Sequence, residues 1–156
     1  MAYLPMISGG GAMNLKVLYD KGVKAGVTFN YVTNGGASVK VAEDTGSYLY
    51  VHVQNGTNTI ASIATAIDAT DYDMVLFHEW GGTNATGINL YCEASQRTVW
   101  NYTQTNDIGV AQRDGWWGLD ITHLTGTQYA GFEAHNGGAN VNRELKCDYI
   151  ALVKFS

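Results

Sequence analysis

The sequence predicts an all-β protein, built as an antiparallel sandwich or barrel, and three observations support that prediction. Apolar and polar residues alternate with a period of two along most of the chain, as they do in half-buried strands. Turn-forming pairs such as Asn34-Gly35, Asn55-Gly56 and Asp114-Gly115 separate these segments at short intervals. The composition agrees, because 19 Gly and 10 Tyr accompany a charged fraction of only 15%.

The expected strands follow from the pattern of each segment. Residues 27–32 (VTFNYV), 38–42 (SVKVA) and 128–134 (QYAGFEA) alternate between apolar and polar side chains. Residues 74–80 (MVLFHEW) are apolar on both faces, as in a central strand. Residues 59–67 (TIASIATAI) suit either a strand or the one helical interruption of the pattern.

Three further segments predict which side chains share a face. In residues 47–54 one face carries Leu49, Val51 and Val53, and the other carries Tyr48, Tyr50 and His52. In residues 87–94 one face carries Ile88, Leu90 and Cys92, and the other carries Asn89, Tyr91 and Glu93. The last segment, 145–155, is expected to be a long closing strand with one face formed by Leu145, Cys147, Tyr149, Ala151, Val153 and Phe155. Cys92 and Cys147 are therefore expected to be buried, reduced thiols and not a disulfide.

The length of 156 residues fits one domain, which we expect to span residues 14–156 because no linker interrupts the strand pattern. Residues 1–13 (MAYLPMISGGGAM) form an uncharged, apolar N-terminal arm with three consecutive glycines. The arm lacks the basic start and the continuous apolar run of a secretory signal, so we expect synthesis in a cytoplasm without a signal peptide. A net charge of -5 with nine scattered Lys and Arg disfavours nucleic acid and membrane surfaces as partners.

The arm is a candidate for assembly. Pro5 and the glycines prevent an amphipathic helix, so the isolated peptide would be disordered and would expose its apolar side chains. The assembly residues are Tyr3, Leu4, Met6 and Ile7. Docking on another subunit would bury them, and so would folding back over an edge strand of the same chain. Both arrangements stay open at this point.

Two segments echo each other around an Asp-x-Thr turn. In AIDATDYDMVLFHEW and GLDITHLTGTQYAGFEAH, Asp68 and Asp120 can accept backbone N–H bonds that shape the turn before an aromatic-bearing strand. With the DYIAL sequence of Asp148–Leu152, this pattern resembles the jelly-roll-like β-sandwich of bacteriophage tail and minor structural proteins and of bacterial surface modules related to carbohydrate-binding modules. The resemblance covers roughly residues 48–155, and the start LPMISGGGAMNL is similar to the start of phage minor structural proteins.

This resemblance implies a jelly-roll-like β-sandwich that serves as a non-enzymatic virion structural protein. Such a protein would be a tail-associated, fibre or head-decoration component, attached through its arm to other virion proteins and contacting host-surface glycans. The resemblance also implies a homo-oligomer, and trimers are common in such assemblies. The alternative is a stand-alone carbohydrate-binding, lectin-like module.

Aromatic residues are the strongest candidates for a binding surface. Trp and Tyr rings stack on the C–H faces of sugars and equally anchor protein interfaces, so residue type alone does not separate the two partners. Because Trp116 and Trp117 are consecutive, they cannot both point inward from an extended segment. The candidate ligand-binding residues are Tyr48, Tyr50, Trp80, Trp100, Trp116 and Trp117.

Catalytic and metal-binding patterns are weaker. The strand-borne carboxylates lack the paired-acid motif of a sandwich-fold glycosidase, and we expect solvated outer-face positions for Glu79, Glu93 and Glu133. The histidines share no zinc-ligand spacing, which predicts surface or turn positions for His52, His78, His123 and His135. Calcium has one weak candidate, formed by Asp68, Asp71 and Asp73, with turn formation by Asp68 as the competing interpretation. We expect no catalytic residue and no cofactor.

Overall fold

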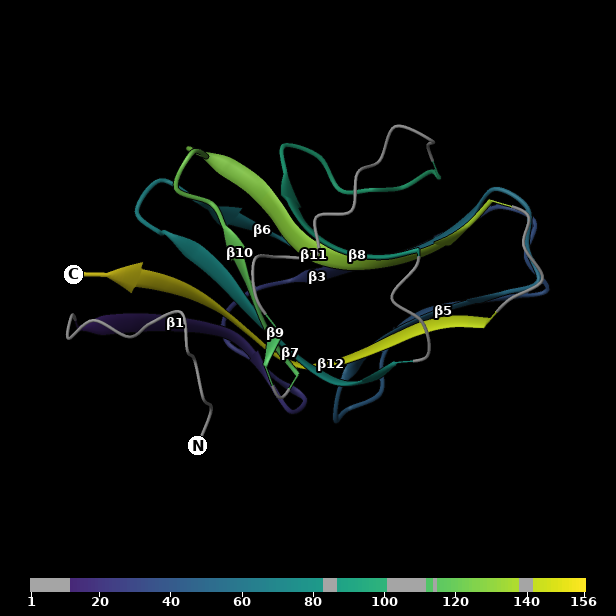
Figure 1. The fold of residues 1–156 in the computed structure, drawn as a ribbon, viewed down its shortest axis with the longest axis horizontal. Coiled ribbons are helices and arrows are strands. Elements are labelled where there is room, and N and C mark those ends of the chain that lie inside the picture. Colours follow the sequence, from purple (N-terminus) through teal and green to yellow (C-terminus); the bar gives the residue numbers. More distant parts are fainter. Residues whose placement is uncertain (1–11, 83–86, 101–111, 114, 138–141) are drawn as a thin grey trace.

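The computed structural model describes residues 12–82, 87–100, 112–113, 115–137 and 142–156. These residues form two antiparallel sheets packed face to face, without a helix, which confirms the predicted β-sandwich (Figure 1). No helix of the described part of the chain is long and apolar enough to cross a membrane. The four assembly residues of the arm lie outside the described residues, and the first strand begins at Met13.

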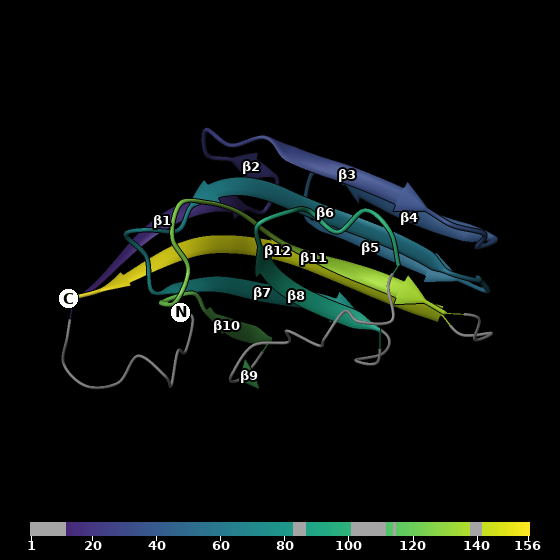
Figure 2. The same cartoon turned by 90° about the horizontal axis from the view of Figure 1, so that it is seen from above.

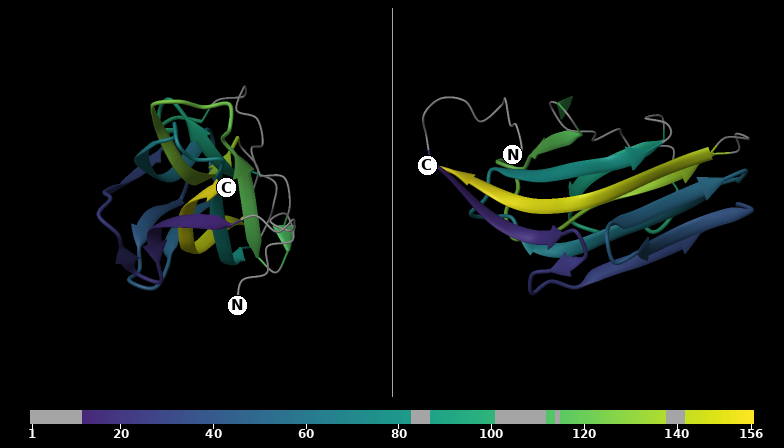
Figure 3. Two further views of the ribbon diagram at one scale, coloured as in Figure 1. Left: turned by 90° about the vertical axis from the view of Figure 1, so that its left-hand side faces the viewer. Right: turned by 90° about the horizontal axis from the view of Figure 1, so that it is seen from below.

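The larger sheet is organised around one long strand, β12 (Asn142–Phe155), whose two halves have different neighbours on one side. Its first half pairs with β5 (Leu49–Gln54), which pairs in turn with β4 (Val39–Asp44). Its second half pairs with β1 (Met13–Asp20), which is followed by β2 (Val23–Lys24). On the other side of β12, seen from below in Figure 3, the order continues with β7 (Met74–Gly82), β10 (Trp116–Asp120) and β9 (Gln112–Arg113).

The smaller sheet has the order β3-β6-β11-β8 and lies over the larger one (Figure 2). Its strands are β3 (Phe29–Asn34), β6 (Thr59–Asp68), β11 (Thr127–Asn136) and β8 (Ile88–Glu93). The ambiguous segment 59–67 is a strand, because β6 pairs with β3 on one side and with β11 on the other. Tertiary pairing thus decides between two states that its small and β-branched residues allow equally.

The core fills the space between the two sheets and draws on most strands of both, including the predicted apolar faces of β5 and β8. From β5 it takes Leu49, Val51 and Val53, which are inaccessible to solvent. Burial of such apolar side chains is the main favourable contribution to folding. Tyr19 also lies in the core, and its hydroxyl donates to Asp44 Oδ1 at 2.8 Å, which satisfies the polar end of the ring.

The closing strand corrects one prediction. The register between β12 and β7 shifts between Cys147 and Tyr149, so a bulge places Asp148 out of the alternation. One extra residue moves every later side chain to the opposite face of the sheet. The core side chains of β12 are therefore Leu145, Cys147, Ile150 and Leu152. The expectation that the whole segment 145–155 shares one face is wrong, because the outer face carries Tyr149, Val153 and Phe155.

Candidate functional site

The outer face of the larger sheet carries an aromatic cluster where β5, β12 and β7 meet. The rings of Tyr48 and Trp80 stack, with centroids 4.8 Å apart and planes 21° apart. The Lys146 ammonium lies 5.2 Å from the centroid of the Trp80 ring and 5.6 Å from that of Tyr48, within the range of cation–π attraction. Tyr50 meets Tyr48 edge to face at 6.1 Å. We call Tyr48, Tyr50, Trp80 and Lys146 the aromatic platform.

Strand register brings the aromatic platform together. Tyr48 and Tyr50 flank the core residue Leu49, so both point to the outer face, and Tyr50 lies opposite Lys146 of β12. Trp80 comes from β7, where Gly81 is opposite Lys146 while Glu79 is opposite Cys147. Trp80 is therefore the extra residue of a bulge, which places its ring over the neighbouring strands.

Trp80 keeps 58% of its surface exposed, although its ring is held by Tyr48 and Lys146. Two contacts fix the position of the indole while a large part of it stays in solvent. A side chain that is already ordered loses little conformational entropy when it binds a partner. This is the arrangement expected of an aromatic anchor in a binding surface.

Polar side chains continue the aromatic platform along β12. The Tyr50 hydroxyl donates to Glu144 Oε2 at 2.5 Å, and His52 Nε2 contacts Asn142 Oδ1. Burial and this hydrogen bond raise the pKa of Tyr50, so its hydroxyl stays a donor at neutral pH. The surface thus combines an apolar ring with carboxylate, amide and ammonium groups. A pyranose offers a matching combination, with an apolar C–H face and hydroxyls around its edge.

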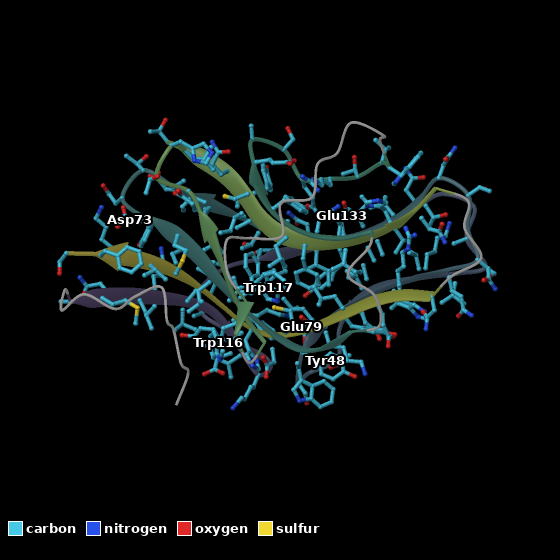
Figure 4. All side chains as sticks on the ribbon, viewed as in Figure 1. Tyr48, Asp73, Glu79, Trp116, Trp117 and Glu133 are labelled. Atoms are coloured by element: carbon cyan, nitrogen blue, oxygen red, sulfur yellow. The ribbon has the colours of Figure 1, made fainter. Side chains whose placement is uncertain are left out.

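The consecutive tryptophans point to opposite sides of β10, as predicted (Figure 4). Trp117 packs against the core, and its indole N–H donates to Glu79 Oε2 at 3.2 Å. Trp116 lies on the outer face, with its ring centroid 4.6 Å from that of His78 and 5.4 Å from that of Tyr149. Both rings are partly buried by the chain itself, which makes them weaker binding candidates than an exposed ring.

Trp100 belongs to a different region. Its indole lies against Gly137, where an added Cβ would come within 2.8 Å of the ring, and its centroid is 6.1 Å from that of His135 on the smaller sheet. Of the six aromatic candidates, the structure brings Tyr48, Tyr50 and Trp80 together and places the three other tryptophans elsewhere.

On the outer face of the smaller sheet, residues 94–100 cover part of the strands. This segment crosses the sheet from β8 at one edge to β3 at the other. Gln96 donates to the carbonyl of Asn30 at 3.0 Å, and Asn34 donates to the carbonyl of Thr98 at 3.2 Å. These bonds tie the crossing segment to the far edge of the sheet. We call residues 94–100 the strap.

The strap buries Arg97, which is only 4% exposed, over the polar side chains of the sheet. Its guanidinium donates from Nη1 to Glu133 Oε1 at 3.2 Å and from Nε to Glu93 Oε1 at 3.1 Å. Its Cζ lies 4.6 Å from the ring centroid of Tyr91. Glu133 additionally accepts a hydrogen bond of 2.6 Å from Asn89. The result is a buried charge pair with several hydrogen bonds, a typical structural network.

The strap explains why the predicted solvation is wrong for Glu133 and only partly correct for Glu93, whose side chain stays 38% exposed. Glu133 is 0% exposed because Arg97 and the strap cover it, and Glu93 is partly covered by the same arginine. Glu79 faces inward, toward Trp117. A segment that follows β8 in sequence folds back over the sheet, which strand alternation alone does not reveal.

The predicted surface or turn positions hold for His123, which is exposed after β10, and for His52, which lies partly exposed on the outer face of β5. His78 and His135 lie within strands and are more deeply engaged in the fold. His78 Nδ1 is 2.5 Å from Asp148 Oδ1, and His135 Nδ1 is 3.1 Å from Glu133 Oε1. These rings therefore take part in polar contacts within the fold.

The aspartates of the calcium candidate have separate roles. Asp68 accepts a hydrogen bond from the backbone N–H of Thr70 at 3.0 Å, which confirms its predicted turn role, and Asp120 accepts the equivalent bond from Thr122. Asp73 accepts the backbone N–H of Phe155 at 2.8 Å, which lowers the pKa of its carboxyl. Among the residues that the structure describes, no three His, Cys, Asp or Glu side chains are arranged to hold a metal ion.

Both cysteines are free thiols, and burial raises the pKa of Cys92 and of Cys147 to about 12. Because the thiolate is the reactive form, neither thiol is expected to react at pH 8 while the protein is folded. Titration with a chromogenic disulfide reagent checks this prediction. Native protein should release no chromophore, and protein unfolded in guanidinium chloride should release the amount that corresponds to two thiols per chain. Rapid reaction of the native protein would contradict the described burial.

Sequence reasoning missed Lys146, Glu144 and Arg97. The first two alternate with core residues on the closing strand, so pairing that strand with 47–54 would have placed them beside Tyr48 and Tyr50. Arg97 lies in a segment without a periodic pattern and gave no signal.

Comparisons with protein-family models, curated proteins and solved structures found no match to the chain, so the family resemblance of its motifs has no independent support.

Proposed function

We propose that the chain is a non-enzymatic binding module that contacts glycans through the aromatic platform, as a component of a bacteriophage particle. The observation that supports the binding role is Trp80, an exposed indole held in place by Tyr48 and Lys146. A single exposed ring is common on protein surfaces, but Trp80 forms a contiguous patch with Tyr48 and Tyr50, and such patches are typical of interaction sites. Their stacking on sugar C–H faces, with hydrogen bonds from neighbouring polar groups, supplies both affinity and orientation.

A glycan fits this surface better than an apolar partner. The Lys146 ammonium lies over the exposed indole, and the Glu144 carboxylate and the Asn142 amide follow it along the outer face of β12, where they contact Tyr50 and His52. An apolar partner would desolvate the ammonium and its polar neighbours, at a cost in free energy. Sugar hydroxyls act as both donors and acceptors and can hydrogen-bond to such charged and polar groups.

Replacing Trp80 with Ala is expected to weaken glycan binding roughly 30-fold, the loss associated with removing an anchor of about 2 kcal/mol. Binding is measured by calorimetry against cellohexaose, xylohexaose, chitohexaose and purified bacterial cell-wall polysaccharide. Tyr31→Ala, which removes another exposed aromatic ring from β3, is the matched control and should bind like the unmodified protein. Circular dichroism confirms that both variants keep the fold.

Two results would contradict the glycan assignment. Either the unmodified protein binds none of these polysaccharides, or Trp80→Ala binds them as well as Tyr31→Ala does. In the first case the platform is an interface for a protein partner, and in the second the sugar binds elsewhere on the chain.

Placement in a phage particle rests on the resemblance of the sequence motifs and on the apolar arm. It predicts that the arm is needed for assembly. Deleting residues 1–11, which leaves β1 intact, should therefore lower the molar mass of the oligomer that the purified chain forms in solution. Light scattering after gel filtration measures this for the two forms of the chain. An unchanged monomer in both would favour the alternative, a stand-alone carbohydrate-binding module, and would leave the glycan test unaffected.

A further inference from the structure

The pairing of β3 with β6 stops before the end of β6. The last pair is Phe29 with Thr65, and its register would next place Thr28 opposite Ala66, Val27 opposite Ile67 and Gly26 opposite Asp68. Those pairs do not form. Gly26 adopts a positive φ of 74°, and the preceding Ala25 donates its N–H to the carbonyl of Leu18 on β1. The chain therefore turns away from β6 toward the other sheet.

This divergence leaves the last three residues of β6 without a neighbour on that edge among the described strands. Ala66, Ile67 and Asp68 pair there only with β11, through Thr127 to Tyr129. A strand edge of this kind presents backbone N–H and C=O groups that can pair with another chain. These three residues are long enough for about one repeat of the backbone hydrogen-bond pattern that joins two antiparallel strands.

A cavity of about 350 Å³ opens beside this edge, where the two sheets separate. Its apolar lining comes from Leu18 and Leu152 of the larger sheet and from Val27 and Ile67 of the smaller side. This volume lies in the range of small ligand-binding pockets and accommodates an aliphatic side chain. The edge and the cavity adjoin because both result from the same turn at Gly26.

Opposite charges also line the cavity, carried by Lys16 on β1 and Asp68 at the end of β6. Neither has an ion-pair partner within 4.0 Å among the residues that the structure describes. Both remain exposed to solvent. A ligand that carries one acidic and one basic group can therefore pair with both.

We propose that this groove binds an extended peptide segment of a partner protein, which adds a short strand to the free edge of β6 and inserts an aliphatic side chain into the cavity. Peptide addition to a sheet edge uses backbone hydrogen bonds for affinity and a side-chain pocket for selectivity. The charges of Lys16 and Asp68 select a segment with an acidic residue on one side of the aliphatic side chain and a basic residue on the other. This site is separate from the aromatic platform and does not depend on the proposed glycan binding.

The test titrates the full-length, ¹⁵N-labelled protein with two peptides, Ac-Glu-Val-Leu-Val-Lys-NH₂ and Ac-Lys-Val-Leu-Val-Glu-NH₂, which present the two charge orders. One of them should shift the amide resonances of Ala66, Ile67 and Asp68. That peptide is then methylated either on its Leu nitrogen or on both Val nitrogens. Only one set of alternate amides can face β6, so one methylated peptide should bind about tenfold more weakly and the other should bind unchanged.

Protein variants test the cavity and the charges. Val27→Phe fills the cavity and should weaken binding about tenfold, whereas Val23→Phe, at an exposed position of β2 outside the cavity, should not. Asp68→Asn retains the turn-forming acceptor but removes the charge, and should reduce the preference between the two charge orders. The proposal is overturned if neither peptide shifts these resonances, if both methylated peptides bind equally, or if Val27→Phe, shown to be folded by its spectrum, binds like Val23→Phe.

Discussion

Replacing Arg97 with Met is expected to destabilise the protein by about 3 to 5 kcal/mol, because the substitution leaves the charge of Glu133 buried without its cation. Met preserves much of the length and apolar volume of the arginine stem, so loss of packing contributes little. The strap also loses its central contact with the sheet. Guanidinium chloride unfolding of the two proteins measures the difference in free energy.

A second substitution separates the charge effect from the packing effect. In Arg97→Met combined with Glu133→Gln, no charge is left buried at this position, and we expect more than half of the lost stability to return. Lys154→Met is the matched control, since its ion pair with Asp73 is exposed to solvent and should contribute less than about 1 kcal/mol. If Arg97→Met lowers the free energy of unfolding by no more than Lys154→Met does, then Glu133 is not a buried charge that depends on Arg97.

Gly131→Ala is the other substitution with a large expected effect, a loss of about 3 kcal/mol or more. Gly131 lies at the centre of β11, between Ala64 of β6 and Tyr91 of β8. A Cβ at this position would lie 2.0 Å from the carbonyl oxygen of Ile63 and 2.7 Å from the Cα of Ala64. Relief of that clash requires the central strands of the smaller sheet to move apart, since the obstacle is backbone.

Gly81→Ala provides the comparison, because the nearest atom to its added Cβ is Lys146 Cδ at 3.9 Å, an ordinary contact. It should change stability by less than about 1 kcal/mol. Thermal and denaturant unfolding of both variants give the two values. Equal stability of Gly131→Ala and the unmodified protein would mean that β6 and β11 lie farther apart than described.

The strands that sequence reasoning placed correctly are those whose pattern is decided by one buried face. Leu49, Val51 and Val53 point to the core because a period of two keeps every second residue on the same side. The same rule failed beyond Cys147, where a bulge at Asp148 reverses the faces. A bulge follows from the fit between neighbouring strands, and the local alternation of residues carries no sign of it.

The candidate site was partly predictable for the same reason. Tyr48, Tyr50 and Trp80 stand out as aromatic residues on expected outer faces, but their grouping depends on β5, β12 and β7 being neighbours. The Glu144 carboxylate that holds the Tyr50 hydroxyl comes from a distant part of the chain. Residue type indicated the chemistry, and long-range pairing supplied the partners.

The sequence by itself determined the class of the fold, the apolar faces of β5 and β8 and the turn roles of Asp68 and Asp120, because these depend on interactions between residues close in the chain. Only the tertiary structure decided that Glu133 is buried, that Trp80 is held by Tyr48 and Lys146, and that the end of β6 has no second neighbour among the described strands and lies beside a cavity. Those features depend on which distant segments lie side by side. Sheet topology decides that, and local periodicity does not contain it.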